Sequence, residues 1–304
     1  MLYDVIVVGG GPGGYTAALY AARSGLTVAV LEKLSPGGQM ATTSQIDNYP
    51  GFPDGVDGFD LGQQMARQAE KYGARTILAE VTGADLAASP KVLHTSEGDF
   101  QGRAVILATG AYPRELGLPD EGALRGRGVA YCATCDGMMY RGKVVAVNGG
   151  GNTAVEDALY LSKLCAKVYL IHRRDQLRAS AVYRKALDEQ GVEILWNSRV
   201  TALRHEAKLT GVELEDTKTG AKRELACDGL FVAIGRVPDT ALFAGQVDMD
   251  EAGYLKADET CRTSLPGVFA VGDVRTKAVR QVVTAAADGA NAAHFAEEYL
   301  MNNV

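Results

Sequence analysis

Two cysteines three positions apart are the residues best suited to chemistry in this chain. Cys132 and Cys135 form a C-x-x-C pair, and Asp136 follows directly. Cysteines at this spacing can close a small disulfide, and a helix start beside them lowers the pKa of a thiol. Asp136 is placed to carry a proton beside a thiolate leaving group, or to cap the next helical turn. The group predicts thiol–disulfide chemistry.

A C-x-x-C pair also occurs in structural zinc sites, which need four ligands. The sequence has no second C-x-x-C, and its four histidines, at positions 94, 172, 205 and 294, are singly placed. The remaining cysteines, at positions 165, 227 and 261, are expected to be buried or inert thiols. We therefore expect no metal and favour a redox-active pair over a zinc site or an inert pair.

A glycine-rich loop near the N-terminus is typical of a dinucleotide site. Gly9, Gly11 and Gly14 satisfy G-x-G-x-x-G, with Pro12 inside the motif. Glycine is needed there for a tight turn, for close approach of the backbone to a pyrophosphate, and for packing of helix on strand. Glu32 ends the following strand, where a carboxylate can accept hydrogen bonds from ribose hydroxyls.

A second loop, with the pattern G-x-G-x-x-A, lies well over a hundred residues later. Its candidate nucleotide contacts are Gly149, Gly151, Asn152 and Thr153.

A basic cluster follows the second strand of this later unit, where the first unit has an acid. It consists of His172, Arg173 and Arg174, with Arg178 four residues further on. A carboxylate there would repel a 2′-phosphate, whereas guanidinium groups bind phosphate with charge-assisted hydrogen bonds. The cluster predicts NADP(H) rather than NAD(H), although it could also be a solvated basic surface.

The elements that must position these loops alternate between strand and helix. In each copy an apolar β-branched run precedes the glycine loop, and a helical pattern and a second strand follow. The expected elements are strands 3–8 and 27–31 around helix 15–24, and strands 144–147 and 168–171 around helix 153–164. This pattern predicts an α/β protein with two Rossmann-like, doubly wound domains.

Composition and charge exclude several other classes of protein. Apolar residues make up 47% of the 304 residues and charged residues 22%, which argues against disorder. The formal net charge of −6 gives no basic surface for nucleic acid or for an anionic membrane. No long apolar run and no signal-peptide pattern is found, so we expect a cytoplasmic protein without a membrane span.

Taken together, the motifs resemble those of the low-molecular-weight, bacterial-type thioredoxin reductases, FAD-dependent members of the pyridine nucleotide-disulphide oxidoreductase family. The likeness runs over nearly the whole chain. It is carried by residues 9–14, 36–39, 47–52, 132–137, 149–154, 172–174, 267–273 and 280–281. The placement of the C-x-x-C is the specific feature. It lies in the second nucleotide domain, whereas glutathione-reductase-like relatives carry it near the N-terminus.

The resemblance implies roles for several further residues. Asp273 would bind the ribityl–pyrophosphate region of FAD, and Arg280 and Gln281 would lie along the flavin. The FAD pocket would be completed by Gly38, Gln39 and Asn48.

The resemblance also implies a domain plan. An NADPH domain, residues 111–241, would be inserted into an FAD domain formed by residues 1–110 and 242–304. Residues 108–110 and 235–236 would act as hinges for a domain rotation. The protein is expected to be a homodimer.

The implied mechanism starts with hydride transfer from NADPH to FAD. Electrons then pass to Cys135, Cys132 leaves as a thiolate, and Asp136 manages a proton. Cys132 next attacks the disulfide of thioredoxin or a thioredoxin-like protein, and Cys135 resolves the mixed disulfide.

Two positions depart from the family pattern. Met138 and Met139 stand where an aromatic pair is common, beside the expected partner surface, and Asn148 replaces an aliphatic residue before the second glycine loop.

Other functions stay open at this point. One is a reductase of the same fold that is fed by ferredoxin, which would not need the basic cluster. Another is the flavoprotein of a peroxide-reducing, peroxiredoxin-type system, which would need a separate carrier protein. A third is a non-enzymatic flavin redox sensor.

Overall fold

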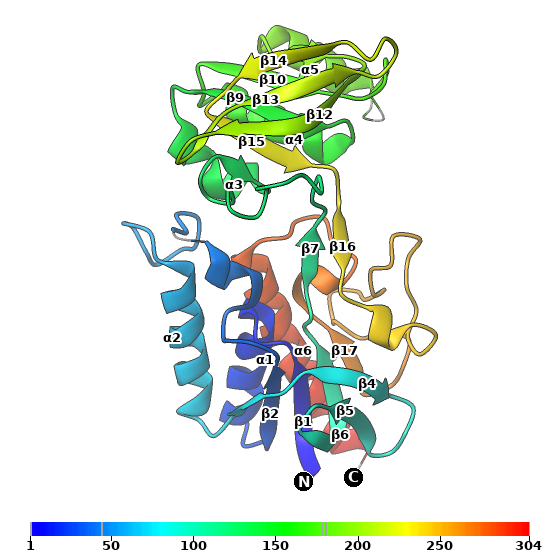
Figure 1. The fold of residues 1–304 in the computed structure, drawn as a ribbon. Coiled ribbons are helices and arrows are strands. Elements are labelled where there is room, and N and C mark those ends of the chain that lie inside the picture. The colour runs from blue at the N-terminus through cyan, green and yellow to red at the C-terminus, as the bar shows by residue number, and fades with distance from the viewer. Residues whose placement is uncertain (1, 44, 178, 180, 304) are drawn as a thin grey trace. The chain divides into compact units, whose positions relative to one another are not determined.

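The computed structural model describes residues 2–43, 45–177, 179 and 181–303 (Figure 1). The chain forms two compact units. Unit 1 comprises the chain up to Tyr112 and again from Val237, and unit 2 runs from Pro113 to Arg236. The sequence places the expected divisions at residues 110/111 and 241/242, a few residues from these points. Which unit binds which nucleotide stays a prediction.

Unit 1 is built on a parallel sheet whose strands follow buried β-branched runs. Its order is β3 (Arg75–Leu78), β2 (Val28–Glu32), β1 (Leu2–Val8), β6 (Gly98–Leu107) and β17 (Val268–Ala270). The last of these strands comes from the second segment of the unit. Pairing of β17 with β6 therefore joins the two segments that unit 2 separates in the sequence.

Strand β6 takes part in two pairings on the same edge. Residues 105–107 pair with β17 in parallel, whereas residues 98–102 pair with β5 (Lys91–Thr95) in antiparallel. Strand β4 (Val81–Asp85) continues that antiparallel layer. The length of β6 thus lets one strand take part in the parallel sheet and in a second, antiparallel layer.

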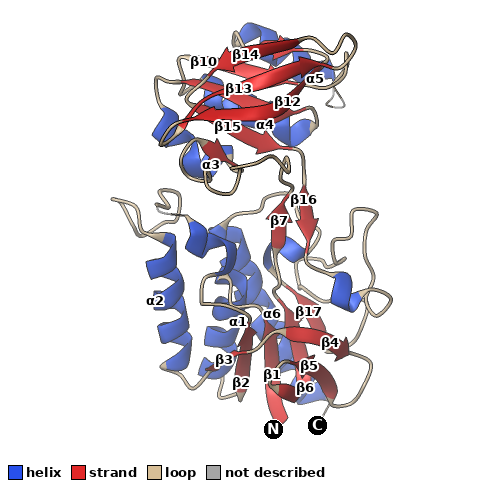
Figure 2. Cartoon of the chain, viewed as in Figure 1, coloured by secondary structure: helices blue, strands red, loops and turns tan. Residues whose placement is uncertain are grey.

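The two faces of the unit 1 sheet are covered differently. Because side chains alternate along a strand, Val5 and Val7 of β1 face one core, and Ile6 and Val8 face the other. The first core contains helices α1 (Pro12–Arg23), α2 (Gly58–Glu70) and α6 (Val282–Asn302). Figure 2 shows these helices together on one side of the strands. The second core is closed by β4, β5 and the segment around Phe243–Leu255.

Unit 2 repeats this plan. Its parallel sheet has the order β11 (Glu193–Leu195), β10 (Lys167–Ile171), β9 (Val144–Gly149), β15 (Gly229–Ala233) and β8 (Val129–Ala130). Helices α4 (Asn152–Ser162) and α5 (Ala181–Glu189) pack on one face. The antiparallel strands β12 (Ser198–His205) and β13 (Leu209–Asp216) cover the other, and β14 (Lys222–Ala226) pairs with β13.

The expected pair of Rossmann-like α/β domains is confirmed. Both predicted β–loop–α–β units form, as β1–α1–β2 and β9–α4–β10. The second face of each parallel sheet is covered by strands, where a doubly wound sheet would have helices. The reason in unit 1 is that β6 extends beyond the parallel sheet and recruits β5.

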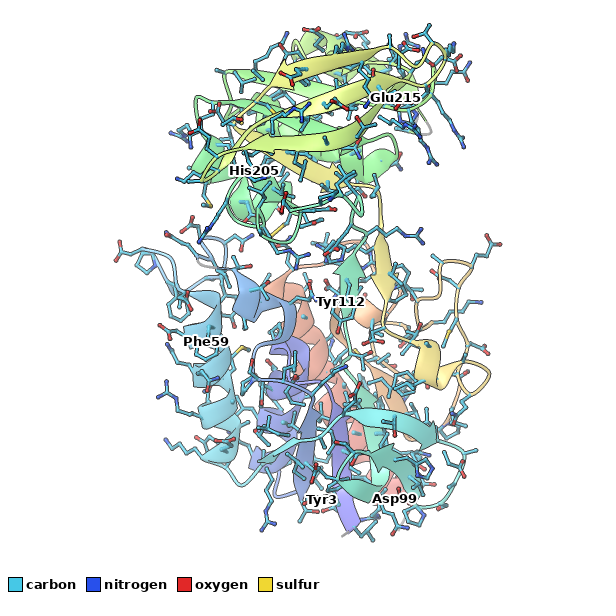
Figure 3. All side chains as sticks on the ribbon, in the orientation of Figure 1. Tyr3, Phe59, Asp99, Tyr112, His205 and Glu215 are labelled. Carbon is cyan, nitrogen blue, oxygen red and sulfur yellow. A yellow bond between two sulfur atoms is a disulfide. The ribbon has the colours of Figure 1, made fainter. Side chains whose placement is uncertain are left out.

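The two segments that connect the units run side by side. Strand β7 (Ala111–Pro113) pairs with β16 (Arg236–Pro238), and the amide of Arg114 donates to the carbonyl of Gly235 at 2.9 Å. Tyr112, labelled in Figure 3, lies on β7. The predicted hinge residues therefore lie in or beside this two-stranded ribbon.

Candidate functional site

The predicted redox pair is present as a disulfide. The Sγ atoms of Cys132 and Cys135 are joined, and their Cα atoms lie 5.3 Å apart. Cys132 is the N-cap residue of the short helix α3 (Ala133–Asp136), and its Sγ lies 3.5 Å from the Oγ1 of Thr134. Both cysteines are half-buried in unit 2. A partly exposed disulfide beside a hydroxyl donor is suited to exchange with an external thiol.

Asp136 lies one residue beyond the disulfide, and it is also half-buried. Burial raises the pKa of this carboxyl from its usual value near 4 to about 6. Its side chain makes no capping hydrogen bond to the following 3-10 helix η2 (Gly137–Tyr140) among the described residues. The capping alternative is thus not seen, and Asp136 can carry a proton near neutral pH.

The first glycine loop shows why glycine is required there. Gly9 has a positive φ of 104°, and a Cβ at this position would lie 2.6 Å from the carbonyl oxygen of Ala108. A Cβ on Gly14 would collide with the carbonyl of Gly9, whereas a Cβ on Gly11 would meet open space. No contact within the chain requires glycine at position 11. Its backbone surface is therefore available to a ligand.

Helix α1 begins earlier than the expected residue 15. Pro12 occupies its first turn and Gly11 is the N-cap, because proline is favoured where no amide donor is needed. No side chain of the described residues caps this end. The free amides of the first turn can therefore bind an anion such as a pyrophosphate.

Glu32 lies at the end of β2 beside this loop and is 9% exposed. Its Oε2 accepts from the amide of Gly10 at 2.7 Å, and its Oε1 accepts from the amide of Leu34 at 3.0 Å. These bonds fix the carboxylate at the edge of the glycine loop, where the sequence predicts a ribose contact.

Other predicted flavin residues from distant parts of the chain meet here in unit 1. The side-chain amide of Asn48 donates to Gln281 Oε1 at 3.0 Å, across 233 positions. A Cβ on Gly38 would lie 3.2 Å from Gly11, which places the start of η1 (Gly38–Thr42) against the loop. Gln39 is exposed in the same short helix.

Asp273 and Arg280 come from the second segment of the unit. Asp273 lies in η4 (Gly272–Val274), and a Cβ on Gly13 would lie 3.6 Å from the amide nitrogen of Gly272. The guanidinium of Arg280 stacks 4.1 Å from the ring of Tyr254. Its Nε is buried and has no hydrogen-bond partner among the described residues. This buried donor is therefore available to a ligand or water acceptor.

Sequence reasoning did not identify a buried ionic cluster beside η4. Asp288 on α6 binds both Arg275 and Lys277. These three residues belong to none of the sequence motifs described above. Their pairing becomes visible only in the folded chain.

The second glycine loop resembles the first at the start of its helix, although Gly149 lacks the positive φ of Gly9. Helix α4 begins at Asn152 with Gly151 as its N-cap, and no described side chain caps it. A Cβ on Gly149 would lie 2.5 Å from the carbonyl oxygen of Ala233, and a Cβ on Gly151 would meet open space. Asn152 and Thr153 are exposed at the helix start. Asn148 lies in β9 opposite Ile171, and nothing in the structure explains its departure from the family pattern.

The basic cluster divides into a buried residue and exposed ones. His172 is 6% exposed, and its ring nitrogens lie 2.9 Å from the carbonyl oxygens of Gly149 and Gln176. Arg173 and Arg174 are exposed and form no ion pair within the described part of the chain. Arg178, the fourth predicted contact, lies outside the described residues. The guanidinium groups of both arginines are therefore accessible to solvent, and their contact with a phosphate stays a prediction.

The remaining cysteines are free thiols among the described residues. Cys227 and Cys261 are buried, Cys165 is half-buried, and burial raises their pKa values to about 12, 12 and 11. Such thiols are poor nucleophiles at neutral pH, as expected from the sequence.

Comparison with known proteins places this arrangement in a family. The model of the pyridine nucleotide-disulphide oxidoreductases matches residues 3–289. The chain is 48% identical over 301 residues to a thioredoxin reductase of Streptomyces clavuligerus, covering 98% of this chain and 94% of the relative. The chain belongs to the thioredoxin reductases of the pyridine nucleotide-disulphide oxidoreductase family.

Two further thioredoxin reductases extend this likeness. The one from Treponema pallidum (strain Nichols) is 45% identical over 299 residues, covering 98% of this chain and 97% of the relative. The crystal structure from Streptococcus pyogenes MGAS5005 is 40% identical, covers 99% of both chains and superposes with a TM-score of 0.92. Members of this family use a flavin and a nicotinamide nucleotide.

The described part of the chain offers neither a membrane-spanning helix nor a metal site. Among the described residues, no helix is long and apolar enough to cross a membrane. Within the same part of the chain, no group of three or more His, Cys, Asp and Glu side chains could hold a metal ion.

Proposed function

We propose that this chain is an NADPH-dependent thioredoxin-disulfide reductase, with FAD in unit 1 and NADPH in unit 2. The observation that carries the proposal is the Cys132–Cys135 disulfide beside Asp136, in the same unit as a dinucleotide loop followed by arginines. When bound, FAD supplies a two-electron carrier that accepts hydride from NADPH and passes electrons to a disulfide.

The residues of unit 1 fit FAD in charge and in shape. The open surface of Gly11 and the uncapped start of α1 suit the pyrophosphate, and the carboxylate of Glu32 suits the adenosine ribose. Asp273 suits the ribityl hydroxyls, and Arg280 Nε is a buried donor that needs an acceptor. Gln281, tied to Asn48, is held beside it.

The residues of unit 2 fit NADPH. The start of α4 faces the pyrophosphate in the same way, and the exposed guanidinium groups of Arg173 and Arg174 suit the 2′-phosphate. This pair also favours NADPH over ferredoxin as the electron source. His172 contacts the carbonyl oxygen of Gly149 and thereby supports the glycine loop.

The exchange with the partner then proceeds through the two cysteines. Two electrons and one proton convert the disulfide to a Cys132 thiolate and a Cys135 thiol, with Asp136 able to carry the proton. Cys132 attacks one sulfur of the partner disulfide, and the other sulfur leaves as a thiolate. Cys135 then attacks Cys132, which closes the original disulfide and releases the partner as a dithiol.

The partner is expected to be thioredoxin or a thioredoxin-like protein. Met138 and Met139 follow the redox pair and are 45% and 49% exposed, and such flexible side chains adapt to a docked surface. Met139 and Arg127 also line a cavity of about 130 Å³ in unit 2. A homodimer and a cytoplasmic location are part of the same proposal, carried over from the family.

The decisive experiment compares serine variants of the two cysteines. In Cys132→Ser and Cys135→Ser, steady turnover of thioredoxin with NADPH should fall to background, because one sulfur cannot both attack and resolve. Both variants should still oxidise NADPH stoichiometrically in an anaerobic titration followed by flavin absorbance. Cys135→Ser should trap a mixed disulfide with thioredoxin, and Cys132→Ser should not.

Cys165→Ser is the matched control, since Cys165 is a half-buried free thiol of the same unit. It should turn over like the wild type. Wild-type turnover by either redox-pair variant would contradict the disulfide relay. A trapped mixed disulfide in Cys132→Ser alone would reverse the assigned roles of the two sulfurs.

A further inference from the structure

A buried carboxylate on helix α6 binds two cations. Asp288 is 5% exposed, and Arg275 contacts it in a bidentate manner, with Nε to Oδ2 at 2.9 Å and Nη2 to Oδ1 at 2.7 Å. Lys277 Nζ donates to Oδ2 at 2.7 Å. The side chains of both cations are less than a tenth exposed. Removal of one partner from such a cluster would leave charges buried without compensation.

The same carboxylate holds the turn that presents Asp273. The amide of Gly272 donates to Asp288 Oδ2 at 2.9 Å, and Gly272 has a positive φ of 73°, which favours glycine. Lys277 also donates to the carbonyl of Thr284, in the first turn of α6, at 3.2 Å. The cluster thus ties the turn at Gly272 to the beginning of the helix.

The neighbouring residue on α6 touches the other flavin loop. A Cβ on Gly289 would collide with the carbonyl of Gly13, and it would lie 2.8 Å from the amide nitrogen of Ala17. Helix α6 therefore meets the start of α1 in backbone contact (Figure 1). Asp288 and Gly289 together fix the pyrophosphate loop and the Asp273 turn to one point on a single helix.

Electrostatics favours the charged form of this cluster. Burial raises the pKa of Asp288, but hydrogen bonds from Arg275 and Lys277 outweigh it and hold the pKa below its usual value. The carboxylate is therefore ionised at neutral pH and is a strong acceptor for the Gly272 amide.

We propose that Asp288, held by Arg275 and Lys277, is a positioning residue for FAD. It fixes the Gly272–Asp273 turn against the glycine loop before the cofactor arrives, so that little ordering accompanies binding. This inference rests on the proposed FAD site of unit 1. Asp288 acts through Gly272 and Asp273, without contact to the flavin.

The test weakens the cluster at its least connected member. In Lys277→Met, the Asp288–Arg275 pair remains, so the chain should still fold. We expect amide hydrogen exchange in residues 268–276 to accelerate about tenfold, and the FAD dissociation constant to rise about tenfold. Lys277→Arg, which keeps the cation, should restore most of both properties. Exchange is measured on the full chain with and without FAD.

Arg103→Met is the matched control. Arg103 pairs with Asp4 at 3.2 Å and donates to the carbonyl of Leu300 at 3.4 Å, at the other end of α6. It should lower the melting temperature without a change in FAD affinity or in exchange at residues 268–276. This contrast separates positioning from general loss of stability.

Each outcome decides one hypothesis. Unchanged FAD affinity and unchanged exchange in Lys277→Met would overturn the positioning role. Fast exchange of the Gly272 amide in the wild-type chain would also overturn it, whatever the variants do. A wild-type chain that binds no FAD would refute the proposed function instead. Amide hydrogen exchange in the flavin-free chain would still test whether Asp288 holds the Gly272–Asp273 turn.

Discussion

The two units place unlike residues at the same point of the same fold. In unit 1, Glu32 ends β2, and its Oε2 accepts from the amide of Gly10 at 2.7 Å. In unit 2, His172 follows β10, and its Nδ1 lies 2.9 Å from the carbonyl oxygen of Gly149. Each side chain is buried and braces the glycine loop of its own unit.

The residue between the first two glycines of each motif is also a glycine, Gly10 in unit 1 and Gly150 in unit 2. The absence of a side chain there leaves space for Glu32 or His172. A Cβ on Gly10 would lie 2.9 Å from Glu32 Oε2, and a Cβ on Gly150 would collide with the imidazole of His172. The comparison teaches that this position braces the loop in both units. Under the proposed function, we expect nucleotide choice in unit 2 to depend on the exposed residues that follow, Arg173 and Arg174.

The largest effect should come from those arginines. Replacing both Arg173 and Arg174 by Gln should raise the Michaelis constant for NADPH about tenfold to a hundredfold per lost phosphate contact. The constant for NADH should change little, because NADH lacks the 2′-phosphate. Steady-state kinetics with both nucleotides measures this. Lys185→Gln, at an exposed lysine of α5, is the control. Equal effects on the two nucleotides would break the comparison.

Removal of the acidic brace should act on the other cofactor. In Glu32→Ala, FAD affinity should fall roughly tenfold or more, because a hydrogen-bond acceptor is lost from a buried site. NADPH affinity should stay unchanged. Both are measured by fluorescence titration, with Glu80→Ala, an exposed carboxylate of unit 1, as the control. Unchanged FAD affinity in Glu32→Ala would show that the acid only braces the loop.

The basic brace should have a smaller effect, shared by both nucleotides. His172→Ala removes the ring contacts to the carbonyls of Gly149, which is buried, and Gln176, which is not, and this should cost about 1–3 kcal/mol of unfolding free energy. NADPH and NADH should both bind a few-fold more weakly. Denaturant unfolding and the two Michaelis constants test this. A loss confined to NADPH would mean that His172 itself meets the 2′-phosphate.

The smallest effect concerns the buried carboxyls. Asp136 has a folded pKa of about 6, so its protonation stabilises the fold below about pH 4, and this contribution disappears as the pH rises through 6. Asp288, whose pKa is lowered, contributes stability above about pH 4 that is lost on further acidification. From pH 4 to 7, Asp136→Asn should therefore gain about 1 kcal/mol on the wild type, allowing for partial exposure. Asp288→Asn should be less stable than the wild type by a nearly constant amount from pH 4 to 7, and this difference should shrink below about pH 4. Thermal unfolding at several pH values decides, and identical trends would refute the contrast.

Much of the fold follows from local sequence. The glycine loops, their flanking strands and the acid or basic residues after them are short-range patterns, and the structure forms both units. The start of α1 at Pro12 shows that boundaries depend on detail, here on the preference of proline for the first helical turn.

Properties that depend on tertiary partners could not be predicted. The sequence did not show that His172 is buried whereas Arg173 beside it is exposed, since the His172 ring is held by contacts with the carbonyl oxygens of Gly149 and Gln176. The Asp288 cluster joins residues 11 and 13 positions apart, and the Asn48–Gln281 bond spans most of the chain. Coverage of the second sheet face of unit 1 by strands likewise required the pairing of β6 with β5.

The paired strands β7 and β16 have an engineering consequence. Unit 2 enters and leaves through neighbouring strands, and the amide of Asp239 donates to the carbonyl of Gly110 at 3.0 Å at the base of this ribbon. A short loop between these two residues could therefore replace the whole insertion. The two segments of unit 1 would then become one continuous domain. Another domain whose own ends lie close together could also be inserted at the same point.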